Sequence, residues 1–86
     1  MDQSSKDMIL FCLDFVKNNY GEQSQNVQCR NWIAMAIDLL EKSTLSSSGF
    51  MVMNLKEADG YFSGANGSAT ANTVMEKIDM VRALLG

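Results

Sequence analysis

The chain has no histidine and no proline among its 86 residues. Histidine is the usual general base near neutral pH and the commonest metal ligand, so its absence argues against most catalysis. Proline disrupts a helix interior because it lacks a backbone N–H and its ring clashes with the preceding turn. Without proline, no interior position is prevented from continuing a helix. The sequence therefore permits long uninterrupted helices.

A cluster of basic residues is also absent. The seven Lys and Arg residues are spread almost evenly along the chain, and ten acidic residues bring the net charge to −3. A protein that binds nucleic acid normally carries a basic stripe that displaces counterions from phosphates. The charge pattern therefore disfavours a nucleic-acid partner and is compatible with a basic protein partner.

Long hydrophobic runs are absent as well. Residues 8–16 are apolar except for Asp14, and this stretch is about half the length that spans a bilayer. Asp2 and Asp7 do not fit the positively charged flank of a secretory signal. We therefore expect no membrane span, no signal peptide and a cytoplasmic location.

Helical periodicity is the strongest pattern in the first half of the chain. Residues 4–19 and 26–42 each carry apolar side chains over an arc of roughly 200°, wider than the ~100° stripe of an ordinary surface helix. A short polar connection joins the two segments, which predicts an antiparallel helical hairpin. The predicted inner faces are Met8, Ile9, Phe11, Cys12, Leu13, Phe15 and Val16 in the first helix, and Cys29, Trp32, Ile33, Ala36, Leu39 and Leu40 in the second.

Several residues suit the ends of these two helices. Ser4 and Asp7 resemble a capping box at the start of the first helix, and Gly21 suits the left-handed position after its end. Ser24 or Asn26 can cap the second helix.

The segment 50–62 fits two structures. Met51 and Leu55 repeat at helical spacing, whereas Phe50 and Val52 would also suit a short strand, so residues 50–55 alone do not decide between them. The residues that follow favour a helix, and a single strand would lack a partner in this chain. We predict a short helix that ends near Gly60.

The last segment predicts an amphipathic C-terminal helix. Ser68 or Thr70 can cap it, and Arg82 is placed to pair with Asp79 three residues earlier. Together these patterns predict one all-α domain over residues 1–86, built as a small antiparallel helical bundle of about four helices: a helical hairpin, a short third helix and an amphipathic C-terminal helix.

The candidate catalytic residues are few. Cys12 and Cys29 lie near the centres of apolar arcs, which predicts buried, unreactive thiols, and neither has a histidine to activate it. In the predicted hairpin they lie too far apart for a disulfide. Two acidic pairs, Asp38 with Glu41 and Glu76 with Asp79, lie on predicted solvent-exposed helix faces, where carboxyl pKa values stay near normal. We therefore predict no enzymatic activity, no cofactor and no metal site.

Methionine is over-represented, with seven residues in the chain. Met fills irregular gaps in cores and is also used on adaptable binding surfaces, so both interpretations stay open here. Met53, Met80 and Leu84 lie outside the predicted inner faces of their own helices, where burial within a monomer is hard to arrange. The candidate partner-binding residues are Leu10, Phe50, Met51, Met53, Met80 and Leu84.

Two functions remain in view. The first is a small acidic, non-enzymatic protein-binding module that self-associates as a homodimer; inhibitors, antitoxin- or immunity-type proteins, secretion chaperones and regulatory adaptors fit this description. The alternative is a nucleic-acid-binding transcriptional regulator, although the connection between the first two helices is too long and polar for a tight helix-turn-helix. The wide apolar arcs favour the first hypothesis, because so short a chain cannot easily cover both.

Overall fold

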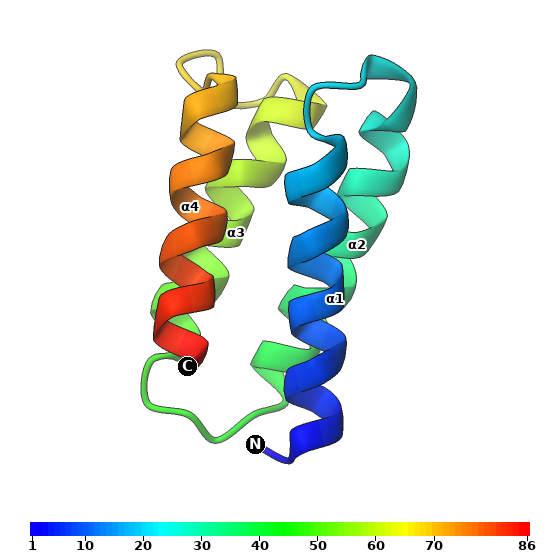
Figure 1. Cartoon of the computed structure of the whole chain (residues 1–86). Helices are drawn as coiled ribbons and strands as arrows, with labels where there is room; N and C mark the ends of the chain where they lie inside the picture. The colour runs from blue at the N-terminus through cyan, green and yellow to red at the C-terminus, as the bar shows by residue number, and fades with distance from the viewer.

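The computed structural model describes all 86 residues and contains four α-helices and no strand. Each helix packs antiparallel beside the next, and α1 also contacts α4, so the four helices close into an up-down-up-down bundle with both chain ends at the same end (Figure 1). The predicted all-α bundle of about four helices is confirmed. The helices are α1 (Gln3–Asn19), α2 (Asn26–Glu41), α3 (Ser48–Ser63) and α4 (Ala71–Leu85), with a 3₁₀ turn, η1 (Gln23–Gln25), before α2.

A single core of 17 buried apolar residues lies between the four helices. Each of α1, α2 and α4 contributes one narrow stripe at helical spacing, since only the side facing the bundle axis is enclosed. The predicted 200° inner faces were therefore wrong at their edges: Met8 and Phe11 are exposed, and Trp32 is half-buried. The stripes are Ile9, Cys12, Leu13 and Val16 in α1; Cys29, Ile33, Ala36 and Leu40 in α2; and Val74, Ile78, Val81 and Leu85 in α4.

The ends of α1 and α2 differ from the prediction. The Asp2 side chain caps α1 by accepting a 2.7 Å hydrogen bond from the Ser5 N–H, so the cap lies two residues before Ser4. Gly21 does not adopt the left-handed conformation, because the chain turns directly into η1. Neither Ser24 nor Asn26 caps α2 with its side chain.

Helix α3 is longer than predicted. Residues 50–55 are helical, as predicted, but the helix continues through Gly60 and ends at Gly64, which has a φ of 78° in the left-handed region. Gly60 lies inside the helix, and the following loop folds back over it. The Asn66 N–H donates a 3.2 Å hydrogen bond to the Gly60 carbonyl.

Helix α4 is held at its start by Thr70 and along one side by α1. Thr70 forms a reciprocal capping box with Thr73. The predicted Arg82–Asp79 pair is wrong: Arg82 pairs with Asp14, and Asp79 pairs with Lys17 at 3.1 Å. This side of α4 faces α1, so both residues find partners across the helix interface instead of within their own helix.

Both thiols are buried and unpaired, as predicted. Burial raises the pKa of the Cys12 thiol to about 11 and also raises the pKa of the Cys29 thiol. The thiolate is the reactive form of cysteine. The raised pKa values therefore keep both thiols in the protonated, less nucleophilic form at neutral pH.

The raised pKa of Cys12 makes stability depend on alkaline pH. In the unfolded chain a cysteine loses its proton above about pH 8.5, whereas folded Cys12 holds it until about pH 11. The unfolded state therefore gains a charge that the folded state resists, and stability is lost as the pH rises. We expect urea titrations to show a loss on the order of 2 kcal/mol between about pH 8 and pH 10.5. Cys12→Ala starts less stable at neutral pH and should lose less over the same interval; an equal loss would contradict this assignment.

Candidate functional site

Most of the exposed large apolar side chains gather on two faces of the bundle, whereas Met1, Val27 and Met75 lie outside them. Because the helices pack in cyclic order, the seam between α1 and α2 and the seam between α3 and α4 lie on opposite sides. The α1/α2 face consists of the exposed Met8, Phe11 and Met35 with the half-buried Phe15 and Trp32. The α3/α4 face consists of the exposed Phe50, Met53, Met80 and Leu84.

Aromatic rings form the centre of the α1/α2 face. The Trp32 ring centre lies 5.2 Å from that of Phe11 at an interplanar angle of 67°, and 5.7 Å from that of Phe15. An edge-to-face arrangement at this distance is favourable for aromatic pairs. Phe11 nevertheless remains 55% exposed. The face therefore combines a fixed ring arrangement with an apolar surface that the chain itself does not cover.

A shallow depression of about 570 Å³ lies at this face. Its apolar lining comes from Met8, Phe11 and Trp32, and its rim carries Ser4 and Asp7. The Asp7 carboxylate accepts a 2.7 Å hydrogen bond from Gln3 and has no cationic partner. No basic side chain lines the depression. It therefore offers an apolar contact beside one unpaired negative charge.

The α3/α4 face is aligned by an ion pair across its seam. The Lys77 Nζ lies 2.8 Å from a carboxylate oxygen of Glu57. Because the helices are antiparallel, this contact places Phe50 level with Leu84 and Met53 level with Met80. The exposed fractions of these four side chains lie between 39% and 49%. The apolar residues thus form one patch beyond the ion pair.

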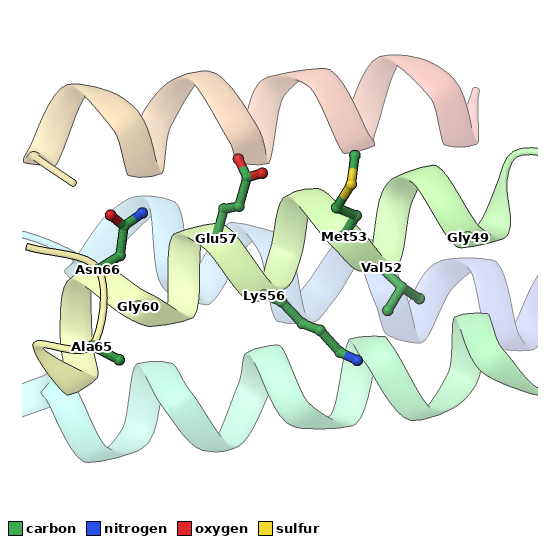
Figure 2. A pocket seen from close by; sticks show the side chains of 8 residues that line it. All are labelled: Gly49, Val52, Met53, Lys56, Glu57, Gly60, Ala65 and Asn66. Atoms are coloured by element: carbon green, nitrogen blue, oxygen red, sulfur yellow. The ribbon is translucent and has the colours of Figure 1, made fainter. Parts of the chain in front are cut away.

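The outer side of α3 is hollowed next to this patch. A depression of about 510 Å³ is lined by Gly49, Val52, Met53, Lys56, Glu57, Gly60, Ala65 and Asn66. Figure 2 shows Met53 and Glu57 projecting toward α4, while Lys56 projects toward α2. The hollow therefore lies along the outer surface of α3, with a cation on its α2 side.

The structure separates the six predicted partner-binding residues. Phe50, Met53, Met80 and Leu84 lie together on the α3/α4 face. Met51 is fully buried, because it lies 200° around α3 from Met53 and packs into the core. Leu10 is half-buried against the core. It lies one turn before Asp14 on the side of α1 that faces α4, so it belongs to neither exposed face.

The sequence prediction missed the α1/α2 face, because it places Met8, Phe11 and Trp32 on the inner faces of the hairpin and does not include Met35 among the partner-binding residues. A signal for it was present in the excessive width of the apolar arcs. A helix in a four-helix bundle encloses only one stripe, so the outer part of each arc had to reach the surface.

Six of the seven basic side chains are engaged within the chain. Lys56 is the exception, with no hydrogen-bond or ion-pair partner. The engaged groups are Lys6 with the Gly86 carbonyl, Lys17 with Asp79, Arg30 with Asp59, Lys42 with Asp38, Lys77 with Glu57, and Arg82 with Asp14.

No group of three or more His, Cys, Asp or Glu side chains is arranged to hold a metal ion. None of the helices combines the length and the apolar character needed to cross a bilayer. Comparison of the sequence with family models, with curated proteins and with solved structures found no match. The two apolar faces are therefore the features on which a function can be argued.

Proposed function

We propose that this chain is a non-enzymatic protein-binding module of the cytoplasm, acting as an inhibitor, antitoxin- or immunity-type protein, secretion chaperone or regulatory adaptor, and that its α1/α2 face binds the partner. The observation that carries the proposal is Phe11, more than half exposed although it packs edge-to-face on Trp32. Aromatic side chains and Met are enriched at protein interfaces, and the residues that dominate binding energy are most often Trp, Tyr and Arg.

The charge beside the depression indicates the chemistry of the partner. Asp7 is unpaired at its rim, and no cation lies among the lining residues. A partner that places a Lys or Arg near Asp7 would gain an ion pair that this chain does not supply. An apolar side chain from the same segment would enter the depression between Met8 and Trp32. An amphipathic helix with one basic flank meets both requirements.

The nucleic-acid alternative receives no supporting observation. Its binding energy would come from several cations on one face. Six of the seven basic side chains already have partners in the chain, and Lys56 stands by itself.

The proposal is tested by capture from the cells that encode the protein, followed by titration. Tagged wild type and Phe11→Lys are crosslinked, and the bound chains are identified by mass spectrometry. A synthetic segment of the recovered partner is then titrated against each variant. Truncation or charging of a central interface residue commonly costs 2 kcal/mol or more, so we expect Phe11→Lys to weaken binding by at least about 30-fold. Asp7→Lys should weaken it by about tenfold through charge reversal.

Met80→Lys is the matched control, because it places the same charge on the opposite face. It should bind the segment as tightly as wild type. Capture of the same chains by Phe11→Lys would contradict the proposal, and so would loss of binding in Met80→Lys alone. Recovery of nucleic acid as the bound species would establish the alternative. Circular dichroism of each variant confirms that the helices are retained.

A further inference from the structure

The α3/α4 face combines exposed apolar side chains with a depression beside them. The α3 half is hollowed, with Gly49 and Gly60 among the residues that line the depression. The α4 half presents Met80 and Leu84, which are 39% and 43% exposed. Each molecule therefore carries the depression and the exposed α4 side chains side by side along one seam. Two copies could each place Met80 against the depression of the other.

The charges at the margins of this face are complementary. Lys56 lies on the α2 side of α3 (Figure 2), and Glu76 lies on the outer side of α4, one turn before Met80. Both are exposed, and neither has a partner in the chain. The Glu57–Lys77 contact sets the register, so Lys56 and Glu76 differ by about two residues, or ~3 Å, along the bundle axis. Opposite charges thus lie at opposite margins and at nearly the same height.

We propose that the α3/α4 face binds a second copy of this chain, in a two-fold dimer whose axis runs parallel to the helices. This operation lays α4 of each copy antiparallel on α3 of the other. It brings Met80 of one copy to the depression beside Met53 of its partner. It also brings Glu76 of each copy to Lys56 of the other, and symmetry makes this contact twice. At the centre, each Glu57 faces the Lys77 of the second copy, so the buried charges alternate in sign.

The α1/α2 face does not have this self-complementarity. Its unpaired charge is the carboxylate of Asp7, and the neighbouring charge on the α2 side, Asp38, is also acidic and already bound to Lys42. A second copy on that face would offer Asp7 no free cation, because the Lys42 ammonium beside Asp38 is already paired. The charge pattern therefore assigns self-association to the α3/α4 face, independently of what the α1/α2 face binds.

The size of the face sets the expected affinity. Two neighbouring helices of about 24 Å, each about 10 Å wide, present roughly 500 Å² per copy, or about 1,000 Å² for the pair. This lies at the low end for specific interfaces, where association is weak. We expect a dissociation constant in the micromolar range.

Sedimentation equilibrium on the full chain tests the dimer over about 1 to 500 µM. The apparent mass should rise from 9.5 kDa toward twice that value. Lys56→Glu and Glu76→Lys should each raise the dissociation constant by about tenfold, because each replaces two attractive contacts by two repulsive ones. The double variant Lys56→Glu/Glu76→Lys restores opposite charges and should return to within about threefold of wild type. Met80→Lys should abolish the dimer over this range.

Phe11→Lys is the control for the other face and should dimerise as wild type does. A chain that remains monomeric throughout the range would overturn the proposal. Dimerisation that ignores both single charge reversals, or a double variant no better than the singles, would overturn the arrangement of the helices. If only Phe11→Lys lost the dimer, the α1/α2 face would be the self-association surface and the proposal would be wrong. None of these outcomes alters the partner titrations at Phe11 and Asp7, so the two proposals can fail separately.

Discussion

Met51→Ala is expected to lower the free energy of unfolding by about 3 kcal/mol, the usual cost of truncating a fully buried Met side chain. Met53→Ala is expected to change it by less than about 0.5 kcal/mol in the monomer. The two residues are of one type and lie two positions apart on α3. Met51 is fully buried, whereas Met53 is 49% exposed. The comparison therefore isolates burial, since helix propensity and composition change equally in both variants.

Urea titrations at a protein concentration below the dimer dissociation constant give both values. The same two variants separate stability from association. Met51→Ala should dimerise normally wherever it is folded, whereas Met53→Ala should weaken the dimer with little loss of monomer stability. Equal destabilisation by the two variants would show that the rotation of α3 in the bundle is wrong.

The fold could be predicted from the sequence because its signals are local. Apolar spacing in α1, α2 and α4 marks the helices, the absence of proline lets them continue, and Thr70 supplies the capping chemistry for α4. The predicted end near Gly60 was wrong for a reason that is not local. Gly60 is required by the approach of the loop residue Asn66, whose Cβ would lie 2.6 Å from a Cβ at position 60. The sequence shows that a glycine is present at position 60, but it does not show which contact excludes a larger side chain there.

The rotation of each helix was harder to predict than its existence. The apolar arcs of α1 and α2 are wide enough to allow several rotations of each helix about its own axis. Contacts with the neighbouring helices determine which part of each arc faces the core. Arg82 illustrates this: it pairs with Asp14 of α1 and not with Asp79 of its own helix, a contact between helices at opposite ends of the sequence. The packing of neighbouring helices likewise leaves Phe11 exposed and Met51 buried. Part of the α3/α4 patch could be predicted. Met53, Met80 and Leu84 lie outside the buried apolar stripes of their own helices, and that position can be recognised from the spacing within one helix.

Gly60→Ala is expected to destabilise the protein by about 2 kcal/mol, against the ordinary preference for alanine in a helix. The added Cβ would lie 2.6 Å from the Asn66 Cβ and 3.3 Å from the Asn66 backbone nitrogen. These atoms cannot rotate away, and the Asn66 N–H is held by its hydrogen bond to the Gly60 carbonyl. The loop between α3 and α4 must therefore move, and that hydrogen bond is strained or lost.

Gly49→Ala provides the matched control, because Gly49 lies in the same helix and a Cβ there would meet nothing within 4 Å. It should stabilise the monomer by about 0.5 to 1 kcal/mol through helix propensity alone. Chemical denaturation of both variants and wild type at low protein concentration gives the comparison. If Gly60→Ala were as stable as Gly49→Ala, the loop would not be packed on α3 as described. The depression beside Gly60 would then have another shape, and it would no longer be the proposed binding position for Met80 of a second copy.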